Sequence, residues 1–300
     1  MSFRSGVVAL VGRPNVGKST LVNAIVGQKV SIVSNKPQTT RRRALGIATS
    51  DDWQIVFVDT PGIHSPVHRL GKVLVETAKQ AVADVDLLLV VVDVSKPPTR
   101  DDEKIALQLK DEWFANEPKR KKPVLCLNKM DLLSADKVQA HFDKYVRLFP
   151  AGETVMTSLS KRQNIDILLG VLVRNLPEGP PLYDSETFTD QTVRTLAAEL
   201  VREKALAKTR QEVPHALATM VESWEESVQM AHICIVVLVE REGQKAILIG
   251  KKGAMLREIG TEARKDIEEM LGKKVYLELF VKVRDDWRQN PRILQELGYL

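Results

Sequence analysis

The most constraining feature of this chain is a glycine-rich segment, residues 12–19, with the sequence GRPNVGKS. It fits the phosphate-binding pattern G-x-x-x-x-G-K-[ST]. An apolar run at 7–11, typical of a buried strand, precedes it, and a helical pattern at 21–26 follows it. That strand–loop–helix context distinguishes a phosphate loop from a chance match. The glycines let backbone N–H groups turn toward an anion, and the helix N-terminus adds partial positive charge.

The loop chemistry predicts a bound nucleotide. We expect Lys18 to reach the β- and γ-phosphates and the Ser19 hydroxyl to coordinate Mg²⁺. The loop residues predicted to bind the nucleotide are Gly12, Arg13, Pro14, Asn15, Val16, Gly17, Lys18, Ser19 and Thr20.

The identity of the base is predicted from the segment NKMD, which follows an apolar strand pattern at 123–127. The Asp131 carboxylate can accept hydrogen bonds from N1–H and the 2-amino group of guanine, and adenine offers neither donor there. Sites built on such polar pairs reject the wrong analogue by about 10⁴-fold. Asn128 is expected to bond the other edge of the base and tie its loop to the phosphate loop, and Lys129 to pack over the ring. A backbone N–H for the guanine O6 is expected from Ser158, Leu159 and Ser160.

A metal and switch site is predicted between these motifs, where DTPG ends a strand pattern at 55–58. We expect Asp59 to hold Mg²⁺ through a water and the Gly62 N–H to contact the γ-phosphate. Contacts that exist only around a triphosphate are the basis of a switch. A second Mg²⁺ contact is expected from Thr39 or Thr40, with Thr40 favoured.

Length and composition agree with a two-domain protein of the cytoplasm. The chain has 300 residues, enough for two cores. Its longest uncharged apolar runs, 87–92 and 233–239, are far shorter than the roughly 20 residues of a membrane span. The N-terminus lacks the pattern of a signal peptide. Cys126 and Cys234 lie in apolar strand patterns and are expected to be buried and without a metal.

The first half alternates strand and helix patterns, which predicts a doubly wound α/β sheet of the phosphate-loop type. The expected strands are 44–49, 53–58 and 87–93, and the expected helices are 68–83, 101–113, 137–149 and 165–176. A proline-rich run at 177–181 ends this pattern. We predict a guanine-nucleotide domain at 1–177, a linker at 178–190 and a second domain with a C-terminal tail at 191–300.

The second domain is predicted to be an RNA-binding KH domain of the α+β class. A helical stripe from 193, strand patterns at 216–221, 232–239 and 275–283, and a helix after Gly253 surround the segment GKKG. A G-x-x-G loop before a helix clamps about four nucleotides in KH domains. Residues 181–300 carry 18 Lys and Arg against 20 Asp and Glu, a net charge of −2. RNA affinity must therefore come from a local patch.

The predicted RNA-binding residues are those of the G-x-x-G loop and the basic side chains expected around it. They are Ile249, Gly250, Lys251, Lys252, Gly253, Arg257, Lys282 and Arg284, and the expected patch also includes Lys273 and Lys274. Neither half of the chain predicts DNA as a partner.

With these motifs the chain resembles the Era family of bacterial GTPases over nearly its whole length. The shared segments are GRPNVGKST, QTTR, DTPG and NKMD, followed by VEREGQK and IGKKG. The resemblance implies a Ras-like GTPase domain joined to a type II KH domain. It also implies a ribosome-associated GTPase that binds small-subunit ribosomal RNA near its 3′ end and assists subunit maturation. Peripheral membrane association is implied by the resemblance alone. One departure is Leu159, because the family commonly has alanine there.

The prediction for catalysis starts from Ile63, the residue that follows the D-x-x-G motif. Ras-like proteins place a water-orienting Gln after D-x-x-G, and here that position is Ile63. Hydrolysis is therefore expected to depend on Lys18, Thr40, the Gly62 N–H and Mg²⁺, which stabilise developing charge. The family resemblance implies that Asn15 ligates a K⁺ ion there. Two alternatives stay open: a non-catalytic RNA-binding module with guanine nucleotide as a static ligand, and a phosphate-loop kinase, which NKMD disfavours.

Overall fold

The computed structural model describes residues 2–34, 36, 39–59, 70, 85–110, 121–149 and 151–299. The chain divides into two compact units. The first consists of Met1–Ser31, Thr40–Ser65 and Leu74–Asp190, and the second of Ile32–Thr39, Pro66–Val73 and Gln191–Leu300. Gly62, Ile63 and the helix expected at 68–83 lie outside the described residues.

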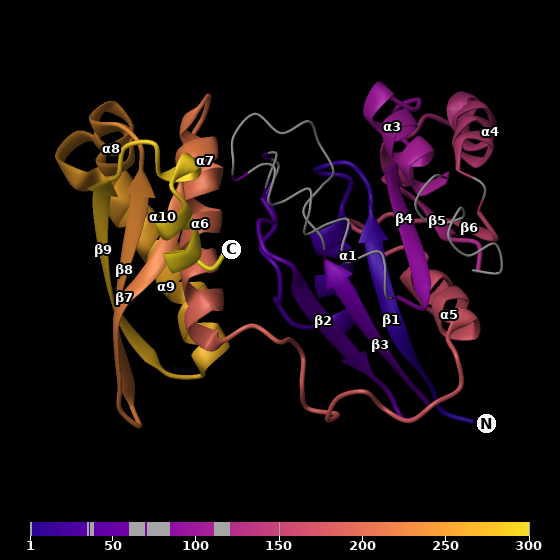
Figure 1. The fold of residues 1–300 in the computed structure, drawn as a ribbon, viewed down its shortest axis with the longest axis horizontal. Coiled ribbons are helices and arrows are strands. Elements are labelled where there is room, and N and C mark those ends of the chain that lie inside the picture. The colour runs from indigo at the N-terminus through magenta and orange to yellow at the C-terminus, as the bar shows by residue number, and fades with distance from the viewer. Residues whose placement is uncertain are drawn as a thin grey trace. The chain divides into compact units, whose positions relative to one another are not determined.

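Six strands form the sheet of the first unit, in the order β2-β3-β1-β4-β5-β6 (Figure 1). β2 is antiparallel to β3, and the other neighbouring pairs are parallel. This arrangement confirms the predicted α/β fold. The strands are β1 (Arg4–Val11), β2 (Ala44–Thr49), β3 (Trp53–Asp59), β4 (Leu87–Asp93), β5 (Val124–Asn128) and β6 (Glu153–Met156).

Helices cover both faces of this sheet because its central strands are apolar on both sides. Val8 and Leu10 of β1 join a core with α1 and α5, whereas Ala9 and Val11 join a core with α3 and α4. The helices are α1 (Lys18–Val26), α3 (Arg100–Leu109), α4 (Val138–Leu148) and α5 (Ile165–Asn175). The expected end of α3 at residue 113 lies outside the described residues.

The strand order places the predicted motifs together at the carboxyl ends of the parallel strands. β1 pairs with β3 on one side and β4 on the other, so the connections diverge around β1. In open α/β sheets, ligands bind at the carboxyl ends of the strands beside such a switch point. Residues 12–17, Asp59, Asp93, Asn128 and 157–160 lie at the carboxyl ends of β1, β3, β4, β5 and β6.

The proline-rich segment predicted as a linker packs along the first unit. The Gln54 side chain is fully buried, and its amide oxygen accepts from the backbone N–H groups of Leu182 and Tyr183 at 2.7 and 2.9 Å. Farther along, the Ile47 N–H donates to the Phe188 carbonyl at 2.8 Å. Proline-rich composition thus predicts irregular backbone, but not freedom from contacts.

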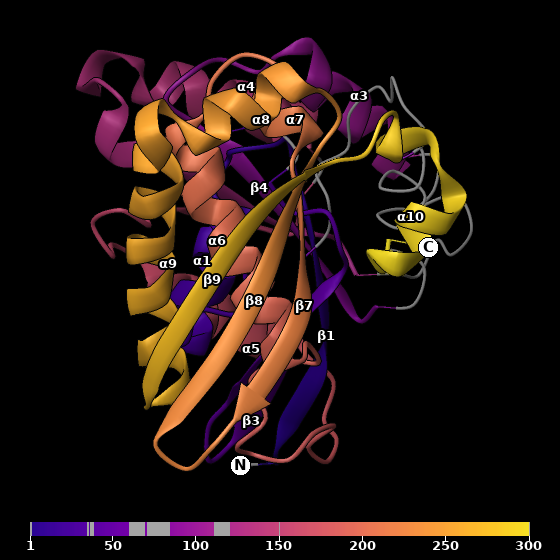
Figure 2. The ribbon, with the colours of Figure 1, turned by 90° about the vertical axis from the view of Figure 1, so that its left-hand side faces the viewer.

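The second unit contains a three-stranded sheet in the order β7-β8-β9 (Figure 2). β7 is antiparallel to β8, and β9 is parallel to it. The helix–strand–strand–helix–helix–strand order confirms the predicted type II KH fold. The main elements are α6 (Val193–Lys208), β7 (Ala218–Glu226), β8 (Met230–Val239), α8 (Glu242–Ile249), α9 (Ala254–Leu271) and β9 (Lys274–Val283).

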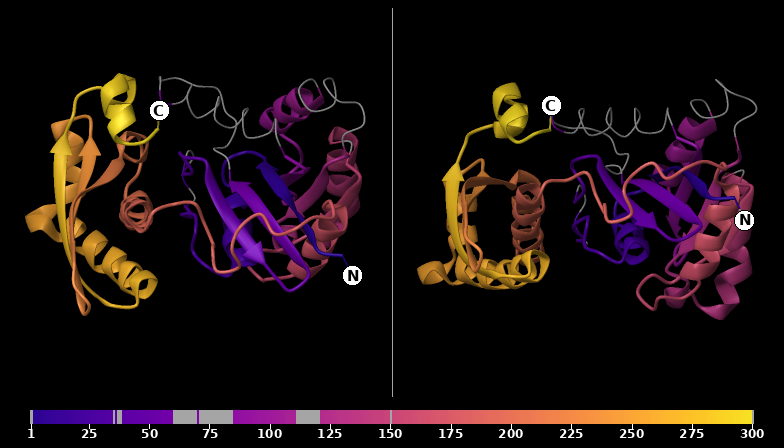
Figure 3. Two further views of the ribbon diagram at one scale, coloured as in Figure 1. Left: turned by 60° about the horizontal axis from the view of Figure 1, so that its bottom comes forward. Right: turned by 90° about the horizontal axis from the view of Figure 1, so that it is seen from below.

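Helices α6 and α9 pack on one face of this sheet (Figure 3). Val201 of α6 and Ile259 of α9 are buried against Ile235 of β8. The segment Ile32–Thr39 also belongs to this unit. Ile32 joins the same core, and the Arg202 guanidinium donates a hydrogen bond to the Thr39 carbonyl. The sequence analysis did not predict this placement.

Three elements of the second unit differ from the sequence predictions. The apolar run before the G-x-x-G loop is the end of a helix, α8, which the predicted order omitted. β7 runs to Glu226 and starts after a short helix, α7 (Val213–Ala216). Its glutamate-rich half faces solvent, which hid the strand pattern. The C-terminal tail includes α10 (Pro291–Glu296), and Trp287 before it is buried, donating to the Ala216 carbonyl at 2.9 Å. Among the described helices, none is both long and apolar enough to cross a bilayer.

We predict that Gln54→Leu lowers the free energy of unfolding by about 2–4 kcal/mol, because it leaves the backbone groups of Leu182 and Tyr183 that pair with the buried Gln54 amide without those partners. Denaturant unfolding measures this loss, and limited proteolysis should show faster cleavage within 181–190. Thr49→Val, which removes only the 3.0 Å bond from the Gln54 amide to Thr49, is the matched control with a smaller loss. Equal stability of Gln54→Leu and the wild type would contradict the structural role of this segment.

Candidate functional site

The phosphate loop (residues 12–19) comes into contact at Gly17 with Asn128–Asp131, the predicted base-recognition segment. Gly17 has a φ of 113°, and a Cβ there would lie 2.4 Å from the Asn128 Nδ2 atom. That amide donates to the Val16 carbonyl at 2.7 Å, and Asn128 is almost fully buried. Only glycine accepts both the conformation and the close approach. The predicted tie between the two loops is present as a direct hydrogen bond.

Lys18 is the charged group at the centre of the loop. Its side chain is buried, and Nζ donates to the carbonyls of Gly12 and Arg13 at 2.9 and 3.0 Å. Burial lowers the pKa of Lys18 to about 8, and the nearby Asp59 carboxylate opposes that shift. An anionic phosphate would stabilise the protonated form, because it supplies the counter-charge that this buried ammonium lacks.

Three side-chain oxygens converge next to Lys18. The Ser19 hydroxyl donates to Asp59 Oδ2 at 2.7 Å and lies 3.0 Å from the Thr40 hydroxyl. The second carboxylate oxygen, Asp59 Oδ1, is buried without a hydrogen-bond partner among the described residues. Burial also raises the pKa of Asp59. A hard cation such as Mg²⁺ fits this set, since it prefers oxygen ligands and would neutralise the buried carboxylate.

This geometry distinguishes between Thr39 and Thr40, the two candidates for the second Mg²⁺ contact. Thr40 faces Ser19 and Asp59, whereas the Thr39 hydroxyl donates to the Lys36 carbonyl at 2.7 Å. The structure therefore brings Thr40, and not Thr39, to the oxygen cluster. Gly62, the other predicted switch contact, lies outside the described residues.

The base-recognition side chains are held by neighbours at the same edge of the sheet. Lys129 Nζ forms an ion pair with Asp93 Oδ2 at 2.7 Å, which fixes the lysine stem. Asp131 is exposed, and hydrogen bonds from the hydroxyls of Ser158 and Ser160 lower its pKa. An ionised, accessible carboxylate is the acceptor that guanine requires. The sequence analysis missed Asp93, although its position at the end of a buried strand pattern marks it.

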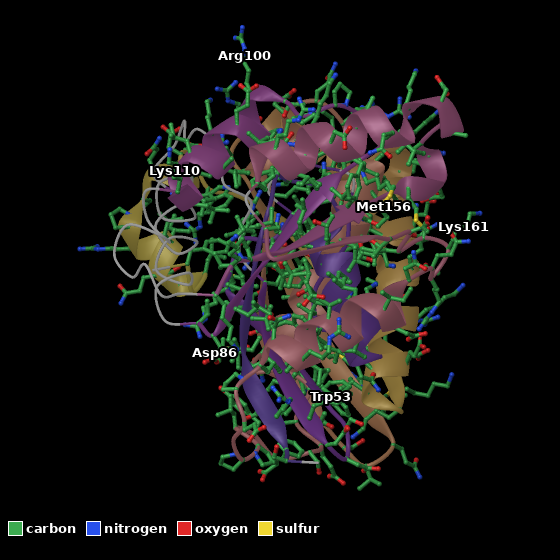
Figure 4. The ribbon with its side chains drawn as sticks, turned by 90° about the vertical axis from the view of Figure 1, so that its right-hand side faces the viewer. Trp53, Asp86, Arg100, Lys110, Met156 and Lys161 are labelled. Carbon is green, nitrogen blue, oxygen red and sulfur yellow. The ribbon has the colours of Figure 1, made fainter. Side chains whose placement is uncertain are left out.

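The loop after β6 closes the base site. The Leu159 N–H donates to Asn128 Oδ1 at 3.2 Å, so Asn128 links all three loops. The Leu159 side chain is buried in the core under α1 and α5, which accommodates the departure from the family pattern. Met156 and Lys161, labelled in Figure 4, bracket this loop.

The G-x-x-G loop of the second unit has an unusual backbone. Gly250, Lys252 and Gly253 have φ values of 71°, 52° and 76°. At Gly250 a Cβ would lie 2.9 Å from the Met255 Cβ, so this approach requires glycine. Lys251 and Lys252 are exposed, and neither forms an ion pair with a described residue. The loop therefore presents two charges and its own backbone to solvent.

A groove runs from this loop between α9 and β9. It is open, and both apolar and basic side chains line it. Arg257, Gly260 and Arg264 follow one another at three- and four-residue spacing along α9, and Tyr276 lies on β9. The sequence analysis predicted Arg257 and missed Arg264 and Tyr276, although the helical spacing of 257, 260 and 264 places them on one face.

Part of the predicted basic patch is neutralised. Lys273 forms an ion pair with Glu226 at 2.6 Å, and Lys282 forms one with Glu222 of β7. Lys274 lies 3.9 Å from Glu268. Arg284 follows β9 directly and is exposed. The unneutralised charge among these described residues is concentrated at the loop and along α9.

We predict that GDP binding takes up a proton above pH 8. Free Lys18 loses its proton as the pH rises through about 8, whereas phosphate-bound Lys18 keeps it. Affinity should therefore fall between pH 8 and 9.5 and stay flat below pH 7. Calorimetry in two buffers of different ionisation enthalpy measures the uptake, with Lys18→Arg as the control that abolishes it. Without nucleotide, Lys18 is deprotonated in the folded chain and protonated in the unfolded chain between pH 8 and 10.5. Lys18 therefore makes the free energy of unfolding of the nucleotide-free protein rise with pH across that window. Proton-neutral binding at pH 8.5 would contradict the assignment.

Comparisons with known proteins agree over the whole chain. Residues 7–129 match the family described as 50S ribosome-binding GTPase, and residues 212–288 match the KH domain family. GTPase Era of Heliobacterium modesticaldum is 43% identical over 99% of this chain and 97% of its own length, and that of Clostridium kluyveri is 44% identical over 99% of both.

Two solved structures are similar at 41% identity over 99% of both chains. One is Era in complex with MgGDPNP and nucleotides 1506–1542 of 16S ribosomal RNA, with a TM-score of 0.92. The other is a variant of Aquifex aeolicus Era bound to GDP and AlF4−, with a TM-score of 0.91. The joined phosphate and base loops, the KH fold and this full-length similarity lead to one conclusion: the chain belongs to the Era family of GTPases.

Proposed function

We propose that this GTPase is a switch that binds small-subunit ribosomal RNA near its 3′ end and assists assembly of the small ribosomal subunit. The observation that carries the proposal is the presence on one chain of a phosphate loop joined to the NKMD segment through Asn128, and of an exposed G-x-x-G loop. The related Era protein that was solved with MgGDPNP and 16S ribosomal RNA supports it. GTP and GDP are the proposed nucleotides, and cytoplasmic location follows from these partners. Peripheral membrane association rests on family resemblance alone.

The proposed domain division follows the two functions. We place the nucleotide domain within residues 1–177, with Ile32–Thr39 packed in the second unit, the connecting segment at 178–190, and the KH domain with its tail at 191–300. Within the first, the loop residues 12–20 and Asn128, Lys129, Asp131 and 158–160 bind the nucleotide. Ser19, Thr40 and Asp59 hold Mg²⁺, with Asp59 acting through a water. Bound Mg²⁺ supplies charge that stabilises the transferring phosphoryl group, and Lys18 does the same from the loop.

The RNA site is proposed at the G-x-x-G loop and the groove beside it. Ile249, Gly250, Lys251, Lys252 and Gly253 would clamp the sugar-phosphate chain, and Arg257 would extend the site along α9. Single-stranded RNA fits better than a duplex, because bases can stack on an aromatic ring such as Tyr276 and need little bulk charge. Lys282 and Arg284 would contact the RNA at the outer end of the site, although the ion pair of Lys282 with Glu222 weakens the contribution of Lys282.

K⁺ is proposed as a second catalytic ion at Asn15. This residue is exposed in the phosphate loop with a φ of 64°, a conformation that asparagine tolerates. An amide oxygen next to the β–γ bridge could share an ion with the phosphates, a role that an arginine takes in other GTPases. The proposal does not depend on Ile63, whose side chain has no polar atom to orient water.

Asp131→Asn should reverse base preference. The new amide donates where the carboxylate accepted, so GTP affinity should fall at least about 10²-fold and xanthosine triphosphate should bind better than GTP. Competition binding with both nucleotides measures the change. An unchanged guanine preference in the variant would refute the base assignment.

Hydrolysis is expected to be slow and several-fold faster in K⁺ than in Na⁺ at matched ionic strength. Asn15→Ala should bring that ratio to one, since the ion then loses its protein ligand. The ratio is its own control, because a general loss of activity lowers both rates equally. Equal rates in the wild-type chain would exclude the ion, and GTP recovered intact would favour the static-ligand alternative.

Lys251→Asp together with Lys252→Asp should abolish binding to an RNA spanning nucleotides 1506–1542 of 16S ribosomal RNA, while GDP affinity stays the same. Filter binding at several salt concentrations tests this. The matched control, Arg210→Asp with Arg292→Asp, makes the same change in net charge at two other exposed positions and should bind RNA within about threefold of wild type. Equal losses in the two variants would show that bulk charge, and not the loop, binds the RNA.

A further inference from the structure

A network of polar side chains lies behind the phosphate loop, and the predicted nucleotide contacts do not explain it. The Arg13 Nε atom donates to Asp102 Oδ1 at 2.8 Å. Asp102 is only 1% exposed and lies in the first turn of α3, whose two ends are marked by Arg100 and Lys110 in Figure 4. A loop residue is thus anchored to a buried carboxylate on a separate helix.

The carboxylate of Asp102 is itself fixed. Its second oxygen, Oδ2, accepts from both the backbone N–H and the hydroxyl of Thr99, each at 2.8 Å. These bonds cap α3 and leave Oδ1 for Arg13. An acceptor with both oxygens engaged and almost no exposure has one orientation, so it holds the guanidinium at a set position.

The network continues toward the base site through Tyr145 of α4. Its hydroxyl lies beside the Arg13 side chain, close enough for the two groups to interact electrostatically, and donates to the Asp93 carbonyl at 3.0 Å. The Asp93 carboxylate in turn pairs with Lys129 at 2.7 Å. One continuous set of polar contacts therefore connects the phosphate loop with the base-recognition lysine, and all its members belong to the first unit.

The position of Arg13 matters for the phosphates through its own backbone. The Arg13 carbonyl accepts from Lys18 Nζ at 3.0 Å. Anchoring the Arg13 side chain restrains the backbone that carries this carbonyl, next to the lysine expected on the phosphates. Near the other end, Lys129 depends on Asp93 for its orientation.

We propose that Asp102 and Tyr145 are positioning residues that act through Arg13 and Asp93 to set the spacing between the phosphate loop and the base loop. Neither touches the nucleotide in this account. The inference rests on the proposed nucleotide site. Its consequence is selective: ligands that engage both loops at once need the spacing, and ligands that engage only the base loop do not.

The test compares GDP with guanosine. Asp102→Asn keeps the shape and the helix cap but removes the charge, and should weaken GDP binding by about tenfold. Tyr145→Phe removes one hydroxyl and should weaken it by about threefold. Guanosine affinity, measured by direct NMR titration, should stay within about twofold in both, since Tyr145 bonds the Asp93 carbonyl and the pair that orients Lys129 uses the Asp93 carboxylate. The double variant should lose less than the product of the single losses, since both residues act through Arg13.

Thr99→Ala is the matched control, because it removes only the hydroxyl from the α3 cap, while the Thr99 backbone N–H still orients Asp102 and leaves its pair with Arg13 in place. It should lower the melting temperature without changing GDP affinity. Arg13→Gln provides a second variant at a partly exposed position, and should reproduce the selective loss of GDP binding if Asp102→Asn does not fold. Unchanged GDP affinity, equal loss of GDP and guanosine, or an equal loss in Thr99→Ala would each overturn the proposal. A wild-type chain that fails to bind GDP would instead refute the nucleotide site itself.

Discussion

The nucleotide site depends on one close approach, that of the Gly17 backbone to the Asn128 side chain. Asn128 donates to the Val16 carbonyl and accepts from the Leu159 N–H, so three loops from three strands meet at one amide. The absence of a side chain at Gly17 makes this possible, because a Cβ would lie 2.4 Å from the amide nitrogen. We propose that different loops recognise the phosphates and the base, and this contact fixes the distance between those loops.

Two opposite charges are buried in the site, which gives a bound metal and phosphates a physical role. Lys18 and Asp59 are both buried, and burial lowers the pKa of the lysine and raises that of the aspartate. Each charge is costly alone in such a place. Mg²⁺ would compensate the carboxylate and the phosphates would compensate the ammonium, so ligand binding relieves unfavourable burial as well as forming contacts. The G-x-x-G loop, the proposed RNA site, differs, since its lysines are exposed to solvent and their charges cost little in the free protein.

The parts of this structure that could be predicted are those in which chemistry and geometry sit in one short segment. Residues 12–19, Asn128–Asp131 and the G-x-x-G loop carry their function in their own spacing. The helix α8 was missed because its last turn, 247–249, is apolar without alternation. Arg202 and Tyr145 could not be predicted, since they bond residues far away in the chain, as with Thr39 and Arg202, 163 residues apart. The cap that Asp102 forms with Thr99 is local, but its pair with Arg13 is not. Buried polar pairs of this kind leave no local pattern.

The most direct test of this account is the affinity of Gly17→Ala for GDP, measured by calorimetry beside Gly27→Ala. Both glycines have positive φ, 113° and 77°, so both variants carry a conformational cost. Only at Gly17 does the new methyl group meet another atom, because nothing lies within 4 Å of the position at Gly27. We expect Gly17→Ala to lose at least about 10²-fold in affinity and Gly27→Ala to bind GDP nearly as the wild type does. Equal affinities for the two variants would contradict the claim that this approach joins the loops into one site.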